Sequence, residues 1–527
     1  MTTKYDAPLN EIKFILHDVI NFADIIKYNK FSDYSIDLIN QILDEAARFA
    51  SNSISPLNQI GDQEHSKING SEVTTPTGFK ELYKEFSNNG WNSLSFPSEY
   101  GGQDLPKVVS IICFEMFTAA NMAFSLCPLL TNGSIELLEK YGSDEQKDKY
   151  LHNLISGKWT GTMCLTESQS GSDLATIRTK AEKNGDNYLI KGQKIYITYG
   201  EHDLTENIIH MVLARTSDNG IKGISLFIVP KFLDDGTRND VKAISIEHKM
   251  GINASPTAVL SFGDDNKCIG YLVGEENLGI KYMFTMMNDA RLAVGIEGVG
   301  IMENSYQQAY SYANERIQGK DVNTGETTTI VNHPDIKKNL LKIKSNILTN
   351  RCLAYYAALN IDILRNDPDN SQTAQMIVDL LIPIIKAHAT NMGFDMSAAA
   401  LQIFGGIGYI EETGIAQNIR DAKIAKIYEG TNGIQALDLV MRKLLINDGQ
   451  CLNVFINKVQ DLYTNSKQKE LIDTKIKKLK NITESIQNSL NNKEQEKVAF
   501  IASDYLDLCA IIFLSLIHIS EPTRQDR

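Results

Sequence analysis

Two polar segments of the sequence carry the residue types best suited to hold a cofactor and to move a proton. The first is Cys164-Leu-Thr-Glu-Ser-Gln-Ser-Gly-Ser-Asp173, in which a glycine and small hydroxyl side chains would let the backbone approach a ligand closely. Thr166, Ser170 and Ser172 could bond to polar atoms of a cofactor. The composition alone equally allows an ordinary polar loop rich in serine and glycine.

The second segment is Arg420-Asp-Ala-Lys-Ile-Ala-Lys-Ile-Tyr-Glu-Gly-Thr-Asn-Gly-Ile-Gln435, which surrounds the carboxylate of Glu429. An Ile-Tyr pair precedes Glu429 and a glycine follows it, so the carboxylate should lose hydration and its pKa should rise toward that of a useful general base. Thr431 is placed to cap the next helix, whose N–H groups would suit an anionic or polar ligand. An ordinary exposed glutamate before a helix cap is the alternative.

Other motifs are better explained without chemistry. Gly405-Gly406-x-Gly408 is not a dinucleotide fingerprint, because its spacing differs from GxGxxG and no expected strand precedes it. The nine histidines show no metal-ligand spacing, so no metal site is predicted, and His202 and His210 are expected to be structural.

The elements that must position these segments follow the order helical, β, helical, with a helical tail. In the β region, Asn184-Gly185 predicts a hairpin turn. Ile208–Ala214 and Gly223–Val229 are typical of buried strands. Strands gathered between helical blocks argue against a Rossmann sheet, which would alternate strands and helices. A polar loop is expected at Gln318–Thr329 within the second helical region.

Composition limits the protein class. With 43% hydrophobic and 22% charged residues, the chain of 527 residues is typical of a globular protein. The net charge of −13 disfavours nucleic-acid binding. Seven scattered cysteines without a CxxC pair indicate reduced thiols in a cytoplasmic compartment. The N-terminal sequence lacks a signal-peptide core, and no apolar stretch is long enough to predict a membrane span.

Taken together and in order, several segments resemble the acyl-CoA dehydrogenase family over about Ile36 to Lys443. The segments are Gly90-Trp-Asn-Ser-Leu-Ser-Phe-Pro-Ser-Glu-Tyr-Gly-Gly102, Arg291, Tyr312-Ala-Asn-Glu-Arg316 and Tyr428-Glu-Gly-Thr431. The chain is most similar to the branch that contains 3-(methylthio)propanoyl-CoA dehydrogenases and other large bacterial acyl-CoA dehydrogenases.

The resemblance implies a mainly α fold with a central β domain, in which a β-barrel or sandwich lies between two helical bundles. It divides the chain into an N-terminal extension (1–35), an N-terminal helical domain (36–159), a middle β domain (160–277), a four-helix-type domain with the catalytic glutamate (278–447), a truncated helical tail (452–513) and an adapter-derived segment (514–527).

The resemblance also assigns site residues. It implies that Glu429 is the base and that Arg291 orients it, while Ala290 stands where some members place the base instead. The residues implied to bind FAD are Met163, Leu165, Thr166, Ser172, Tyr196, Ile197, Thr198, Arg316, Gln402, Gly405, Gly406, Thr431 and Asn432. The residues implied to contact the substrate are Ser172, Asn288, Arg291 and Gly430.

Some positions depart from the family pattern. Tyr196 replaces the usual Trp and keeps an aromatic face, while Asn288 replaces an Asp found near the pantetheine in many members. The loop that begins at Thr166 lacks the usual Pro-Gly-Ala, and the usual Phe after Gln318 is missing.

The implied reaction is α,β-dehydrogenation of an acyl-CoA to trans-2-enoyl-CoA in β-oxidation-type catabolism, with electrons passed to electron-transfer flavoprotein by a homodimer or tetramer. One alternative is 3-(methylthio)propanoyl-CoA dehydrogenation in dimethylsulfoniopropionate degradation. An acyl-CoA oxidase would share the same residues. A DNA-binding relative is disfavoured, because Leu452–Phe513 holds nine Lys against eight Asp and Glu.

The end of the sequence has a different character. Leu514-Ser-Leu-Ile-His-Ile-Ser-Glu-Pro-Thr-Arg524 resembles a translated sequencing adapter. We therefore expect the natural chain to follow this sequence only to about Phe513, which resequencing of the source DNA across codon 514 would test.

Overall fold

The computed structural model describes residues 4–463 and 469–519. The chain forms two compact units, which are described separately below. The helical unit comprises Met1–Ser55, Pro106–Ala120 and Arg291–Arg527, and the β unit comprises Pro56–Leu105 and Asn121–Ala290.

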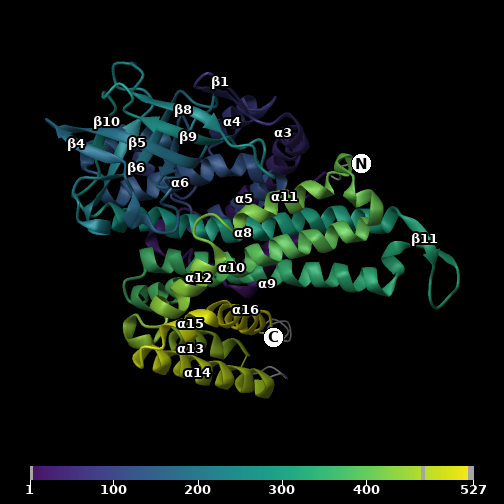
Figure 1. Ribbon diagram of the computed structural model, residues 1–527. Helices are drawn as coiled ribbons and strands as arrows, with labels where there is room; N and C mark the ends of the chain where they lie inside the picture. The colour runs from purple at the N-terminus through teal and green to yellow at the C-terminus, as the bar shows by residue number, and fades with distance from the viewer. Residues whose placement is uncertain (1–3, 464–468, 520–527) are drawn as a thin grey trace. The chain divides into compact units, whose positions relative to one another are not determined.

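The β unit is built around an eight-stranded sheet (Figure 1). Its strand order is β10-β7-β6-β4-β5-β9-β8, with β3 parallel to β6 and β10 also paired with β5. The strands are β3 Trp159–Cys164, β4 Lys180–Asn184, β5 Asn187–Thr198, β6 Asn207–Arg215, β7 Ile224–Pro230, β8 Val241–Ile246, β9 Thr257–Phe262 and β10 Ile269–Leu272.

Apolar runs and two glycines explain this sheet. The residues of β6 and β7 are buried along almost their whole length, which confirms the buried strands expected there. The turn at Asn184-Gly185 joins β4 to β5 in the expected antiparallel hairpin, and Gly185 has a φ of 62°. In β5, a Cβ on Gly192 would lie 2.5 Å from Thr179 Oγ1, so only glycine allows this close strand packing.

Several helices and a small hairpin complete the β unit. The hairpin β1–β2 lies within the region whose dominant pattern predicted helix; its strands are too short to show a period in the sequence. The elements are α3 Asn58–Glu64, β1 Lys67–Asn69, β2 Glu72–Thr74, α4 Phe79–Asn88, α6 Met122–Tyr141 and α7 Asp144–Ile155.

The helical unit contains three long helices that run beside one another: α8, α9 and α10 (Figure 1). Glycines let α8 and α10 approach closely, since a Cβ on Gly298 would lie 2.4 Å from the carbonyl oxygen of Ala389. A Cβ on Gly393 would lie 3.0 Å from Gly298 Cα. This crossing sets which side chains of the two helices meet.

The bounds of the helical unit's elements are as follows. They are α1 Leu9–Phe14, α2 Ile36–Phe49, α5 Lys107–Ala120, α8 Gly279–Glu315 (from Arg291 onward in this unit), β11 Ile317–Lys320, β12 Thr327–Thr329, α9 Pro334–Asn366, α10 Ser371–Phe404, α11 Ile415–Ala425, α12 Asn432–Asp438, α13 Cys451–Tyr463, α14 Lys469–Asn491, α15 Gln495–Phe500 and α16 Ala502–Ile519.

The polar loop expected at Gln318–Thr329 was only partly right. The two ends of this segment pair as the antiparallel hairpin β11–β12. All four residues of β11 are exposed, so this strand has no buried face. Its sequence therefore lacks the alternation of apolar and polar residues that predicts a strand.

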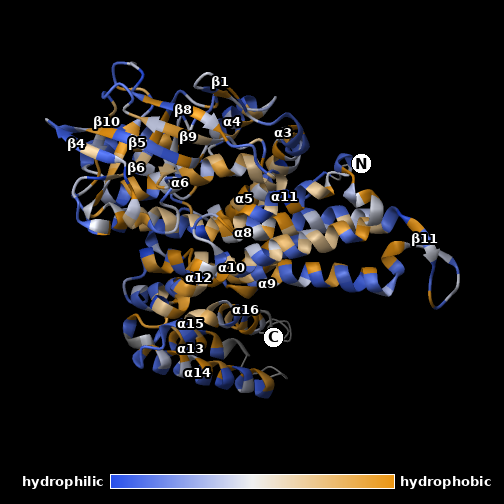
Figure 2. Cartoon of the chain, in the orientation of Figure 1, coloured by the Kyte–Doolittle hydropathy of each residue, from blue (hydrophilic) through white to orange (hydrophobic). Residues whose placement is uncertain are grey.

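The helical tail that the sequence predicted is confirmed as α13–α16. In α14, Ile472, Ile476, Leu479 and Ile486 are buried at the spacing of one helix face, and Figure 2 shows apolar residues interspersed among the polar ones along this helix. Helix α16 continues to Ile519. Residues 520–527 of the expected adapter-derived segment lie outside the described residues, and the adapter origin stays a prediction.

A buried ionic cluster joins three helices of this unit. The guanidinium of Arg351 (α9) lies 2.7 Å from a carboxylate oxygen of Glu115 (α5) and 2.9 Å from one of Glu303 (α8). Tyr355 Oη donates a hydrogen bond of 2.7 Å to Glu115. Removing one member would leave buried charges unpaired, so the cluster fixes how these helices pack.

All seven cysteines are buried and free of disulfides. Within the described part of the chain, no helix combines the length and apolarity that crossing a bilayer requires.

Candidate active site

A tight turn between α11 and α12 presents Glu429. Helix α11 ends at Ala425, and just beyond it the N–H of Tyr428 donates a 3.1 Å hydrogen bond to the carbonyl of Ile424. Glu429 and Gly430 then adopt left-handed φ angles of 55° and 80°. Thr431 caps α12, as the sequence predicted, because its Oγ1 accepts a 3.3 Å hydrogen bond from the Ile434 N–H. A non-glycine residue in the left-handed region is uncommon and is often found at functional sites.

The carboxyl group of Glu429 is largely removed from water. Its Oε2 is buried and receives no hydrogen bond from any described residue. Burial raises the pKa of Glu429 to about 7, although the positive charges of Arg291 and Lys386 oppose this rise. The site therefore has the desolvated carboxyl that the sequence predicted, with a pKa suited to a general base near neutral pH.

Arg291 of α8 lies against this turn. Its side chain is 4% exposed, and its Nε donates a 3.4 Å hydrogen bond to the main-chain oxygen of Glu429. Its Nη1 also lies 3.7 Å from Asp438 Oδ2, and Arg442 binds the same carboxylate. Arg291 therefore holds the backbone of the turn and places positive charge near the Glu429 carboxyl.

Lys386 of α10 is a site residue that sequence reasoning missed. Its fully buried Nζ donates to the Gly430 carbonyl at 2.8 Å and to Asn432 Oδ1 at 3.0 Å. Burial lowers the pKa of Lys386 to about 7, and the carboxyls of Glu429 and Glu297 oppose this shift. A single lysine within the apolar run 380–389 was the available sequence signal.

The side chains of the turn are largely committed to internal contacts. Asn432 Nδ2 donates to Asn391 Oδ1 at 2.8 Å and to the Ala387 carbonyl at 3.1 Å, so this side chain fastens the turn to α10. Gln435 Nε2, also missed from the sequence, donates to the carbonyls of Glu429 at 3.2 Å and Gly430 at 3.3 Å. Glu297, a buried residue of α8, accepts a hydrogen bond from the Tyr428 hydroxyl.

A second site lies at the far end of α10, where Arg316, Gly405 and Gly406 line a cavity of about 450 Å³. The stacked rings of Tyr312 and Phe404, 4.4 Å apart, form part of its wall. A Cβ on either glycine would meet no atom within 4 Å, so the glycines leave open space beside a cationic side chain. This cavity fits a phosphate-bearing group. Gln402 is exposed on the last turn of α10 and is not among the residues that line the cavity.

In the β unit, a buried ion pair anchors the polar loop that follows β3. Lys194 Nζ lies 2.8 Å from Glu167 Oε1 and donates to the Leu165 carbonyl at 2.9 Å. Burial alone would raise the pKa of Glu167, but the lysine charge and hydrogen bonds from the Arg178 and Thr179 N–H groups hold it at about 2. Sequence reasoning missed this pair, which holds the loop residues predicted to bind FAD.

A bulge in β5 turns Tyr196 outward. The pairing of β5 with β9 is irregular between Lys194 and Ile197, and Tyr196 has a φ of 60° and is 60% exposed. The Ile195 N–H donates to the Thr166 carbonyl at 2.9 Å, which ties the polar loop to this strand. Ile197 is 2% exposed within the sheet core, so its side chain cannot stack on a flavin and only its backbone is available.

The remaining predicted residues of the β unit lie at or near its surface. Leu165 is buried, whereas Met163, Thr166 and Thr198 are partly exposed and Ser172 is exposed. An exposed aromatic face beside hydroxyl groups and backbone polar groups fits a planar, polar cofactor such as a flavin. Asn288 is partly buried on α8, one helical turn before Arg291.

The predicted structural role of two histidines is confirmed. His202 and His210 are buried in the β unit and bond to the hydroxyls of Thr160 and Thr162 at 2.9 and 2.8 Å. Burial lowers the pKa of both imidazoles to about 3, so they stay neutral at physiological pH. No group of metal-binding side chains occurs among residues 4–463 and 469–519.

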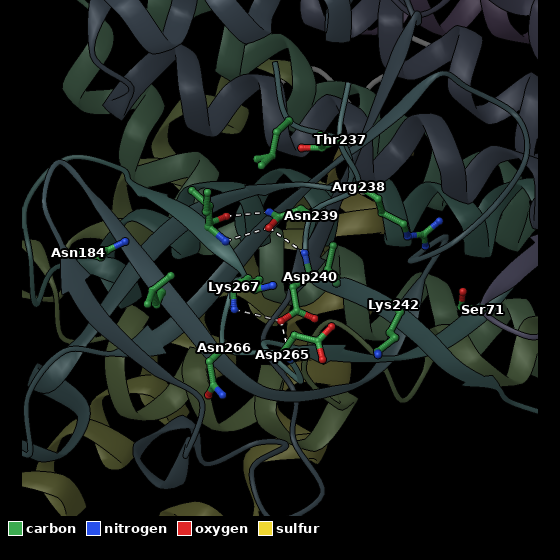
Figure 3. Close-up of a pocket in the computed structure, with 14 residues that line it drawn as sticks. Ser71, Asn184, Thr237, Arg238, Asn239, Asp240, Lys242, Asp265, Asn266 and Lys267 are labelled. Atoms are coloured by element: carbon green, nitrogen blue, oxygen red, sulfur yellow. Dashed lines mark hydrogen bonds between the residues drawn. The ribbon is translucent and has the colours of Figure 1, made fainter. Parts of the chain in front are cut away.

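An open cavity of about 720 Å³ also lies in the β unit, but its polar groups mainly fasten loops (Figure 3). Asp240 accepts hydrogen bonds from the N–H groups of Asp265 and Lys267. Asn239 accepts one from the Ile269 N–H at 2.9 Å. None of the predicted site residues lines this cavity.

Comparison with known proteins identifies the family. The acyl-CoA dehydrogenase N-terminal, middle and C-terminal domain models match residues 38–158, 162–264 and 277–445. The chain is 44% identical to a 3-methylmercaptopropionyl-CoA dehydrogenase from Ruegeria pomeroyi, over 86% of this chain and 78% of that protein. It is 33% identical to a butyryl-CoA dehydrogenase from Syntrophomonas wolfei, over 89% of this chain and 80% of that protein.

The fold agrees with this result. A crystal structure of an acyl-CoA dehydrogenase complexed with FAD from Bacillus anthracis matches with a TM-score of 0.76 and 23% identity, over 95% of this chain and 84% of that one. The expected arrangement, mainly helical with a central β domain, is therefore confirmed. The chain belongs to the acyl-CoA dehydrogenase family, whose members are FAD-dependent oxidoreductases that act on CH–CH groups.

Proposed function

We propose that Glu429 is the general base that removes the α-proton of an acyl-CoA thioester. The observation that carries this proposal is the buried, unpartnered Oε2 of Glu429 on a left-handed turn, with a pKa raised to about 7. A carboxylate of this kind is a much stronger base than one in water and is half ionised near neutral pH.

The residues around Glu429 have separate tasks in this mechanism. Arg291 holds the main chain of the turn, and Lys386 holds the next carbonyl, so the carboxyl is fixed before the substrate arrives. The Glu429 N–H donates no hydrogen bond within the described chain and can stabilise the enolate-like oxygen of the thioester. FAD, when bound, would supply the acceptor that the β-hydrogen needs to leave as hydride, so that the product would be the trans-2-enoyl-CoA.

We further propose that two groups of residues hold FAD. The group in the β unit fits the isoalloxazine end, and the cavity of the helical unit fits the pyrophosphate and adenosine of a cofactor bound by a second subunit. The residues are Met163, Leu165, Thr166, Ser172, Tyr196, Ile197 (through its backbone) and Thr198 in the first group, and Arg316, Gln402, Gly405 and Gly406 in the second. Thr431 and Asn432 act by shaping the turn, because their side chains cap α12 and bind α10.

For the substrate, we propose a short acyl-CoA, with Ser172, Asn288, Arg291 and Gly430 in contact with it. The relatives named above act on 3-methylmercaptopropionyl-CoA, which is the thioester 3-(methylthio)propanoyl-CoA, and on butyryl-CoA. The second candidate function, beside general fatty-acyl-CoA dehydrogenation, is dehydrogenation of the thioether substrate 3-(methylthio)propanoyl-CoA. The higher sequence identity to the first relative favours it. Electron-transfer flavoprotein is the proposed acceptor, and a homodimer or tetramer is the proposed assembly.

The test is a screen of the purified protein with acyl-CoA thioesters of different length, including butyryl-CoA and 3-(methylthio)propanoyl-CoA, and a dye as electron acceptor. We expect the protein to purify yellow with non-covalent FAD and to reduce the dye with a short thioester. Production of hydrogen peroxide in air at the rate of turnover would identify an acyl-CoA oxidase instead. Failure to bind FAD after reconstitution would refute the enzyme assignment.

A further inference from the structure

A second buried carboxyl group, Glu297, lies beneath the turn that carries Glu429. Glu297 is 1% exposed and lies on α8, six residues after Arg291. Its Oε2 accepts a hydrogen bond from the hydroxyl of Tyr428, the residue directly before Glu429 in sequence. Its Oε1 has no hydrogen-bond partner among the described residues. A buried carboxyl with only one bonded oxygen is costly to keep as an anion.

Burial is the main reason that Glu297 favours its neutral form. The pKa of Glu297 is raised to about 8, chiefly by burial and also by the nearby Glu429 carboxyl, against the opposing effects of the Tyr428 hydrogen bond and the Lys386 charge. The Lys386 ammonium is already committed to Gly430 and Asn432. The titratable and charged groups that act on Glu297 are therefore the Tyr428 phenol, which bonds to it, the Glu429 carboxyl, and the Lys386 ammonium, whose hydrogen bonds go to other groups.

Helix α8 packs closely against α10 in the region that carries this carboxyl. A Cβ on Gly295 would lie 2.5 Å from Ile385 Cγ2, and Gly298 is in similarly close contact with Ala389 of α10. Glu297 lies between these two glycines in the sequence, is 1% exposed and accepts the hydrogen bond of Tyr428. One helix, α8, thus supports the turn at two points, through Arg291 to the Glu429 carbonyl and through Glu297 to the Tyr428 hydroxyl.

We propose that Glu297 is a positioning residue for the base, whose carboxyl holds the Tyr428 hydroxyl and thereby keeps Glu429 in its left-handed conformation. This inference rests on the proposed role of Glu429. The hydrogen bond matters because a non-glycine residue at φ of 55° is held against a local preference for other conformations. A neutral side chain that accepts the same hydrogen bond should hold the Tyr428 hydroxyl equally well, since an acceptor oxygen needs no charge to accept it.

The experiment measures anaerobic flavin reduction in the purified, FAD-loaded enzyme as a function of acyl-CoA concentration and pH. The variants are Glu297→Gln, Glu297→Leu and Tyr428→Phe. We expect the Leu and Phe variants to lose about 10–100-fold in the limiting rate with little change in substrate affinity, because the base is present but misplaced. Glu297→Gln should have most of the wild-type rate. It should also show the same fall in rate toward acid pH as the wild type, because Glu297 is already protonated at those pH values.

Two controls show whether the loss of rate arises at this turn and through this base. Tyr355→Phe removes a matched buried hydrogen bond, from Tyr355 to Glu115 outside the turn, and should leave the rate and pH profile of flavin reduction unchanged. Glu429→Gln tests the proposed function itself. If Glu429→Gln is active, the base assignment is wrong; if it is inactive while Glu297→Leu and Tyr428→Phe reduce flavin at the wild-type rate, only the positioning role is refuted.

A purely structural role would give another pattern. In that case Glu297→Leu would lose FAD or unfold, whereas Tyr428→Phe would keep the wild-type rate and pH profile, and the inference would be overturned. Loss of rate in Tyr428→Phe at full FAD content, together with rescue by Glu297→Gln, supports it.

Discussion

Replacing Glu429 with glutamine removes a titrating carboxyl while keeping its size and its place on the turn. The substitution should lower the reaction rate and raise the stability of the fold, and both effects arise because this carboxyl is buried. The variant loses the carboxyl that we propose as the base, so the rate of flavin reduction should fall about 10²–10⁴-fold. It also loses a buried group that becomes charged at neutral pH, so the folded protein should gain stability there.

The size of the stability change follows from the pKa of Glu429, which is raised from 4.5 to about 7. Because the folded state binds this proton more tightly than the unfolded state, the stabilisation is complete below pH 4.5 and is lost as the pH rises through 7. At about 1.4 kcal/mol per pH unit between 4.5 and 7, the wild-type protein should lose about 3–4 kcal/mol of unfolding free energy that the variant keeps.

Two measurements test this reasoning. Anaerobic stopped-flow spectroscopy of the FAD-loaded proteins gives the rate of flavin reduction, which in the wild type should fall about tenfold per pH unit well below pH 7. Urea unfolding at about pH 5 and pH 8 gives the stability difference between variant and wild type. The difference should favour glutamine more strongly at the higher pH.

Either of two results would refute the argument. One is a variant that reduces flavin at a rate close to wild type at pH 8, since Glu429 would then not be the base. The other is a stability difference that does not change between pH 5 and pH 8, since the carboxyl would then have an ordinary pKa.

Three further variants test other parts of the structure. Gly430→Ala should destabilise the turn by about 1–2 kcal/mol and slow flavin reduction, because Gly430 has a φ of 80° and the new Cβ would lie 2.8 Å from Gln435 Nε2; thermal unfolding and stopped-flow kinetics check both. Arg351→Met leaves buried carboxylates unpaired and should cost about 3–5 kcal/mol in urea unfolding, and an unchanged midpoint would contradict the role of the cluster. Lys194→Met leaves Glu167 without its buried partner, so the polar loop after β3, which is predicted to bind FAD, should loosen. FAD should then be lost on gel filtration, whereas a fully yellow protein would show that the ion pair is not needed.

The sequence alone determined the features that depend on neighbouring residues. The turn at Asn184-Gly185, the buried strands β6 and β7, and the Thr431 cap of α12 were predictable, because each arises from local backbone preference or a short apolar pattern. The desolvation of Glu429 was predictable for the same reason, since its apolar neighbours adjoin it in the chain. The order of helical and β regions, with the family motifs, indicated the family that the comparisons then showed.

Only the tertiary structure decided what surrounds Glu429. Lys386 and Glu297 stand out in the sequence as charged residues within short apolar runs, but nothing local brings them to Glu429, which is more than 40 residues away. In the folded chain α10 brings Lys386 to the Gly430 carbonyl and α8 brings Glu297 to the Tyr428 hydroxyl. Such contacts depend on how helices pack, and helix packing depends on shape complementarity between distant segments rather than on the preferences of neighbouring residues.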